Sequence, residues 1–227
     1  MEERGYVIYR DGSRAYIEEG ITVLGELSCD KGKDYLRENV IEIFVPKSVL
    51  MIMEGAFCDF TALEKLRIAK DSMLRCIGNE AFFRCGRLKT VEFENAENLQ
   101  WIGYCAFAFT GLEYTNMSDL NSLEGIGRGI FKGCVHLQAV KLPGGLSIPD
   151  DCFKGCKNLL KVETEDISYI GADAFEGCSS LVKIEIHDEY MYGGVDGDDY
   201  HKVYYRSGNE EFISCMTEKK YIKIIKL

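Results

Sequence analysis

Hydrophobic positions recur along the chain in a phrase that ends on phenylalanine. Its six copies read IMEGAF, IGNEAF, IGYCAF, IGRGIF, IPDDCF and IGADAF. The phenylalanines are 25, 25, 24, 22 and 22 residues apart, at Phe57, Phe82, Phe107, Phe131, Phe153 and Phe175. Isoleucine lies five residues before each, and leucine follows at six, except that Leu112 comes one residue early. Self-similarity at this period predicts a repeat architecture.

Each copy predicts one coil of a solenoid. Apolar residues nine and eleven after the phenylalanine alternate with polar ones, as in a short strand, although the third copy has the weaker Thr115 and Met117 there. The phrase A-F-x-x-C-x-x-L favours one or two tight helical turns, and the glycines that follow Phe131, Phe153 and Phe175 by two suit a permissive backbone. Stacked coils then share one core.

The repeat also predicts where the chain changes character. Residues 38–187 hold a partial copy, from Val40 to Ile52, and six full copies. The extra residues 70–73 and 95–98 should bulge from an edge, each anchored by a following leucine. We expect residues 1–37 to be an N-terminal β cap with turns at Asp11-Gly12 and Gly20. Residues 188–227 should be a C-terminal β cap of three strands, because an open solenoid end needs covering.

These residues resemble the BspA-like leucine-rich repeats. The matching pattern, I-G-x-x-A-F-x-x-C-x-x-L-x-x-V-x-I, is seen best from Ile170 to Ile186. Proline after the strand, common in that class, is kept only at Pro46 and Pro143. The resemblance implies an α/β, strand-rich leucine-rich-repeat solenoid with a parallel sheet on its concave face and short helical turns opposite. It also implies non-catalytic binding of other macromolecules, frequently in adhesion at microbial surfaces.

Composition narrows the choice of partners. The 227 residues carry 27 Lys+Arg against 37 Asp+Glu, a net charge of -10, which disfavours nucleic acid and anionic membranes. We expect no membrane insertion, because long apolar runs are absent from the sequence. The opening residues are not a secretory leader, so we expect a cytoplasmic monomer with an unknown protein partner. The alternative is a cell-surface or adhesion protein that binds host or matrix proteins.

The sequence has ten cysteines, and this count alone does not decide whether they form disulfides, stay free thiols or bind a metal. Four occupy one repeat position, three after the phenylalanine: Cys85, Cys134, Cys156 and Cys178. A ladder of small buried thiols is the favoured reading, although stacked cysteines could come within disulfide range. The pair Cys152 and Cys156 lacks a matching second pair for zinc.

Signals for catalysis are weak. His136, His187 and His201 are the three histidines, and none belongs to a recognisable nucleophile or phosphate-binding phrase. The acidic stretch Asp196–Asp199 has carboxylates suited to calcium but lacks the EF-hand pattern, so a solvated turn is favoured. We therefore expect no enzyme activity, cofactor or metal.

Two outward faces are candidate binding surfaces. Alternation directs two columns of strand residues away from the core, with Tyr114 near the middle as an anchor. The candidate residues are Lys65, Arg67, Thr90, Glu92, Tyr114, Asn116, Lys141, Lys161, Glu163, Lys183 and Glu185. An ordinary solvated surface is the alternative. On the opposite segment, Met51, Cys76 and Trp101 form an apolar patch if exposed, but we expect a loop or the N-terminal cap to cover them.

Overall fold

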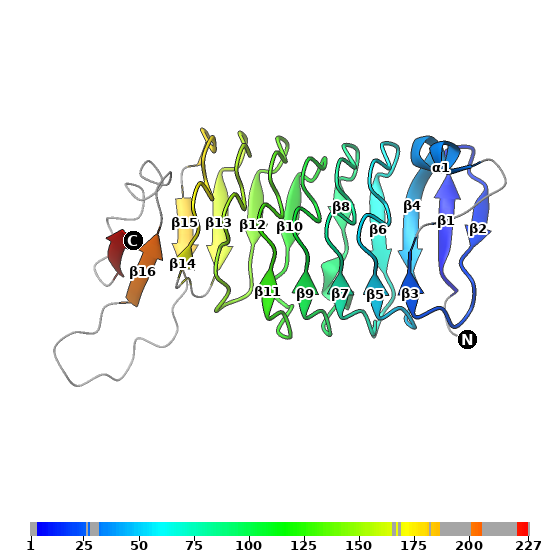
Figure 1. Cartoon of the computed structure of the whole chain (residues 1–227), viewed down its shortest axis with the longest axis horizontal. Coiled ribbons are helices and arrows are strands. Elements are labelled where there is room, and N and C mark those ends of the chain that lie inside the picture. The colour runs from blue at the N-terminus through cyan, green and yellow to red at the C-terminus, as the bar shows by residue number, and fades with distance from the viewer. Residues whose placement is uncertain are drawn as a thin grey trace.

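A computed structural model shows the chain as coils stacked along one axis (Figure 1). It describes residues 4–25, 27, 32–164, 167, 169–181, 183–186, 201–205 and 222–226. Most coils contribute a strand of three or more residues on one side and a two-residue strand on the other. The predicted solenoid with parallel sheets is therefore confirmed.

The longer strands form what we call the long-strand row. Its members are β4 (Val40–Val45), β6 (Lys65–Ile68), β8 (Thr90–Val91), β10 (Tyr114–Asn116), β12 (Ala139–Lys141), β13 (Lys161–Thr164) and β15 (Lys183–Ile186). Parallel ladders join β4 to β6 and β8, and join β10 to β12, β13 and β15. No ladder joins β8 to β10 in the described chain, so the row breaks where the third copy is one residue short.

The shorter strands form a second parallel sheet, the short-strand row. It consists of β3 (Val23–Leu24), β5 (Met51–Ile52), β7 (Cys76–Ile77), β9 (Trp101–Ile102) and β11 (Gly125–Ile126). The second residue of each strand points into the core and the first points outward, as the burial pattern shows. β14 (Tyr169–Ile170) continues the phrase in the last copy.

The phenylalanines form a continuous stack through the core. Successive rings from Phe57 to Phe175 have centroids 5.3, 5.2, 6.3, 5.7 and 5.2 Å apart, with interplanar angles of 22° or less. Leu74, Leu99 and Leu123 are buried and anchor the longer turns as expected. The predicted bulges at residues 70–73 and 95–98 are only partial, because Ser72 is buried in the first and Ala96 in the second. A 3-10 helix, η1 (Phe93–Asn95), ends at the first residue of the second bulge.

Where the sequence predicted short helical turns, the segment around each repeat phenylalanine is a string of tight turns with i→i+3 hydrogen bonds and no regular helix within the described coils. Two residues per coil have a left-handed backbone, two before and two after the phenylalanine. Around Phe57, alternate N–H groups bond locally and to the next coil: Cys58 donates to the Gly55 carbonyl at 3.1 Å, whereas Phe57 donates to Ala81 at 2.8 Å. Backbone N–H groups that would bond within a helix here bond to carbonyl groups of the next coil.

The N-terminal cap contains the strands expected within residues 5–24 and a helix that was not expected. β1 (Tyr6–Tyr9) pairs antiparallel with both β2 (Arg14–Tyr16) and β4. The helix α1 (Lys33–Asn39) buries Leu36 against the first coil, so the cap is not purely β. The helix has seven residues, and no helix in the described part of the chain is long and apolar enough to span a bilayer.

At the other end, β16 (His201–Tyr205) and β17 (Ile222–Lys226) extend a parallel sheet from β14. These are two of the three strands expected in the C-terminal cap. The middle strand and the acidic stretch Asp196–Asp199 lie outside the described residues. The cap boundaries at residues 37 and 188 stay predictions.

Candidate binding surface

The long-strand row carries the two outward columns that the sequence predicted. In β6, Leu66 and Ile68 are buried while Lys65 and Arg67 are partly exposed. The ladders align the remaining candidates coil by coil. Between β6 and β8, Lys65 pairs with Thr90. From β10 to β15 the first column runs Tyr114, Ala139, Lys161, Lys183. The second column runs Asn116, Lys141, Glu163, Glu185.

The N-terminal part of this face is closed by its own contacts. Arg67 lies 3.2 Å from Glu92 through Nε and donates to the Tyr6 hydroxyl at 3.0 Å, while Lys65 lies 2.7 Å from Glu92. Tyr6 stacks on buried Phe44. Burial alone would raise the pKa of Glu92, but hydrogen bonds from Lys65 and Arg67 outweigh it and hold the pKa below its usual value. These three candidates therefore already have intramolecular partners.

The C-terminal part of the face is more open. Tyr114 begins it beside the break in the row and is 53% exposed. Asn116 is exposed, and Lys141, Lys161 and Glu163 are partly exposed around it, with Lys161 2.6 Å from Glu163. The backbone of β15 carries Lys183 and Glu185 into the same two columns. The structure thus divides the predicted surface into an N-terminal part, in which Lys65 and Arg67 pair with Glu92, and a part that we call open because Tyr114 and Asn116 are exposed on it, although Lys161 and Glu163 pair there.

The short-strand row exposes an apolar strip, formed by the outward residues Val23, Met51, Cys76 and Trp101. The ladders place these four side by side. Val23, Met51 and Trp101 are 43%, 41% and 46% exposed, so the expectation that a loop or the cap covers the patch is wrong. The cap instead adds Val23 to it. Nearby Met53 and Tyr104 are also exposed.

The aligned cysteines form a buried ladder of thiols. Each Sγ donates to the carbonyl oxygen of the phenylalanine one coil earlier: Cys85, Cys134, Cys156 and Cys178 at 3.1, 3.1, 3.0 and 3.1 Å. All eight cysteines in the described residues are free. Burial raises the pKa of Cys134 to about 11. Such thiols are poor nucleophiles at neutral pH, which agrees with a packing role.

A buried carboxylate on the turn side is likewise fully engaged. Asp151 accepts from Arg128 at 2.8 Å and from Lys132 at 3.3 Å, and Lys154 lies 3.8 Å away. Burial would raise the pKa of Asp151, but these two hydrogen bonds lower it further than burial raises it. The cluster pairs charges between coils, Arg128 and Lys132 with Asp151 of the following coil.

The structure brings no catalytic or metal centre together in the residues it describes. No group of three His, Cys, Asp or Glu side chains there has metal-binding geometry. His136 is exposed on the turn side, whereas His187 lies outside the described residues and only the backbone of His201 is described. Cys152 is buried in the core beside the thiol ladder.

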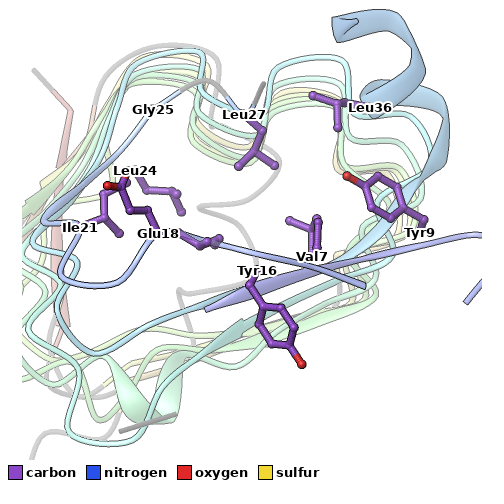
Figure 2. Close-up of a pocket in the computed structure, with 11 residues that line it drawn as sticks. Val7, Tyr9, Tyr16, Glu18, Ile21, Leu24, Gly25, Leu27 and Leu36 are labelled. Carbon is purple, nitrogen blue, oxygen red and sulfur yellow. The ribbon is translucent and has the colours of Figure 1, made fainter. Parts of the chain in front are cut away.

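A small cavity of about 270 Å³ lies within the N-terminal cap (Figure 2). Val7, Leu24, Leu27 and Leu36 border it, and Tyr16 points away from Leu36. All of its lining residues belong to the cap, between Val7 and Leu36. We therefore regard it as a packing space of the cap.

Comparison with known proteins identifies the repeat. A family model described as BspA type leucine rich repeat region, in six copies, matches residues 34–160 and 77–194. No curated protein sequence matches the chain.

One solved structure supports the fold, and a second is reported with it. The pneumococcal vaccine antigen PcpA is 15% identical, with a TM-score of 0.53, and the match covers 98% of this chain and 48% of the antigen. The chain thus spans about half the length of that protein. A leucine-rich repeat protein of T. pallidum is 22% identical over 78% of this chain and 86% of its own, with a TM-score of 0.48. At these identities the likeness concerns the fold alone.

Proposed function

Because the chain belongs to the BspA-type leucine-rich repeat family, we propose that it is a non-catalytic module that recognises another protein. The binding surface is the open part of the long-strand row, from β10 to β15. The observation that carries this proposal is the half-exposed Tyr114 at the head of two aligned polar columns. In a parallel sheet the successive residues of one column lie ~4.8 Å apart, on neighbouring strands, and this gives a partner a regular, rigid surface.

The chemistry of this surface suits a protein. Tyrosine is enriched among the residues that dominate binding energy, since it adds apolar area and a hydroxyl at little entropic cost. Lys141 on the next strand, and Lys161 and Glu163 on the one after it, add both signs of charge to this face. Because the surface carries both positive and negative charges, it can bind a partner with complementary charges in one orientation, and its carboxylate disfavours a polyanion. Nucleic acid is therefore not the proposed partner.

A non-catalytic role is supported by the hydrogen bonds and ion pairs that the aligned thiols and two carboxylates already make within the chain. The thiols are buried donors, and Glu92 and Asp151 are held by cations. We further propose that the protein acts as a monomer in a reducing compartment such as the cytoplasm, because free thiols persist there. Thiol titration tests this on protein that is isolated from its natural source and then denatured. Near-complete oxidation of the cysteines would instead favour the cell-surface alternative.

The binding proposal is tested by capture from native lysate on the immobilised chain. Tyr114→Ala and the double variant Lys161→Glu/Lys183→Glu should each lose the captured protein without a change in melting temperature. Lys157→Glu is the matched control, because Lys157 is exposed on the turn side of the coil that carries Lys161. Equal capture by the wild type and both test variants refutes the assigned surface.

A further inference from the structure

Trp101 is held flat on the short-strand row by a glycine in the next coil. The ladder pairs Trp101 with Gly125. A Cβ built on Gly125 would lie 2.4, 3.1 and 3.3 Å from three atoms of the six-membered indole ring, Cζ3, Cε3 and Cη2. The ring therefore rests across the outward side of Gly125. With the side chain 46% exposed, its opposite face is open to solvent.

The glycine serves the ring and not the backbone. Gly125 is absent from the residues with positive φ, so its conformation is open to any residue. The same position carries side chains in the other copies: Met51, Cys76, Trp101, Ser147 and Tyr169. The one missing side chain is thus the one that would lift the indole from the sheet.

The surroundings of the ring are polar and carry both signs of charge. Arg75 and Gln100, each next to a strip residue in sequence, and Glu124, next to Gly125, are exposed. Beyond the ring, Asn79 accepts from the Tyr104 backbone N–H at 2.9 Å and donates to Glu54 at 3.4 Å. Because both signs are present, charge complementarity selects no ionic ligand, and Gln100 and Glu124 can exchange hydrogen bonds with hydroxyl groups.

The apolar strip by itself is far smaller than a stable interface between two proteins. Four strands at ~4.8 Å spacing and two residues each give a face of roughly 15 by 7 Å. A stable interface needs about 800 Å² from each partner. An occupant of a few rings in size fits this area.

We propose that Trp101 is a stacking platform for a neutral, gluco-configured pyranose of a glycan. A pyranose with equatorial substituents has a face of C–H groups that suits the electron-rich indole face, and an edge of hydroxyls for the polar rim. This site is separate from the Tyr114 surface and does not depend on the proposed function. It would give the module a second, carbohydrate-directed contact.

Trp101 is the sole tryptophan, so its fluorescence reports directly on the site. The wild type is titrated with β-1,4-linked glucose hexamer and with β-1,4-linked N-acetylglucosamine hexamer at up to millimolar concentration. We expect a saturable emission shift and protection from acrylamide quenching with at least one. Gly125→Ala keeps the fluorophore but tilts the ring, and should weaken binding by about tenfold or more.

Calorimetry with Trp101→Ala should show loss of binding at an unchanged melting temperature, while Tyr114→Ala binds as the wild type does. Saturable binding that requires both Trp101 and Gly125 supports the proposal. Absence of a shift with both hexamers overturns it, as does equal binding by Gly125→Ala. A proline-rich peptide or self-association that alone changes the Trp101 emission also overturns it, in favour of a protein contact.

Discussion

Thr115 provides a sharp test of how the core is built. Its side chain occupies the inward strand position that the neighbouring coils fill with Val91 and Val140, and it is 2% exposed. Within the described residues its hydroxyl has no hydrogen-bond partner. Thr115→Val replaces that hydroxyl with a methyl group of similar size, so the perturbation removes an unpaired polar atom and little else.

The expected gain follows from the cost of the orphaned hydroxyl. Leaving a buried polar group unpaired costs about 1–3 kcal/mol, and the added methyl contributes a further hydrophobic term of up to ~1 kcal/mol. Some tightness around the new methyl offsets part of this. We therefore expect Thr115→Val to raise the free energy of unfolding by about 1–2 kcal/mol. Each kcal/mol corresponds to roughly 2–4 °C in melting temperature at this size.

Urea and thermal unfolding, followed by circular dichroism, measure the change. The matched control is Thr110→Val, because the Thr110 hydroxyl donates to the Phe107 carbonyl at 2.9 Å and is also buried. That variant should lose about 1 kcal/mol. If Thr115→Val is neutral or destabilised, or if both variants change alike, the hydroxyl of Thr115 is paired in solution and the reasoning fails.

Three further outcomes are expected. Gly155→Ala should lose about 1 kcal/mol in urea unfolding, because φ is +79° while an added Cβ would meet Gly133 only at an ordinary contact distance of 3.8 Å. Arg84→Gly, at φ 61°, should instead gain a few tenths. Cys134 ionises near 9 when unfolded but at about 11 when folded, so wild-type stability should fall between pH 9 and 11 relative to Cys134→Ser, measured as melting temperature against pH. Phe107→Ala should cost about 3–5 kcal/mol in chemical denaturation, and Phe175→Ala less, since Phe107 stacks on two rings in mid-column.

The repeat made much of the fold predictable. The spacing of the phenylalanines specified the coils, the family and the inward columns, and alternation specified which strand residues point outward. The left-handed positions were only half visible. Gly55, Gly129 and Gly133 showed some of them, but other coils place Glu80, Cys105 or Arg84 at the same positions, and these residue types give no signal of positive φ. Contacts between coils impose that conformation.

The candidate surface was predicted less completely for a related reason. Its columns follow from the repeat, but the network around Arg67 depends on Tyr6, 61 residues away in the cap. No periodicity links the two. The exposure of Trp101 was also misjudged, because a sequence shows that a residue points outward but not whether another segment covers it.

The departures from the repeat gather in the coil of Phe107, and this has a physical meaning. That coil is one residue short before Leu112, begins a new sheet at β10 and holds the unpaired Thr115. It also exposes Trp101, Tyr104, Phe109 and Tyr114. Two of these rings lie against glycines of the next coil, Trp101 at Gly125 and Phe109 at Gly133. Local rules of folding are broken mainly where function requires it. The coil that holds an unpaired buried hydroxyl and exposes four aromatic side chains is therefore where binding should be sought on both faces, and stabilising substitutions in its core need not alter that surface.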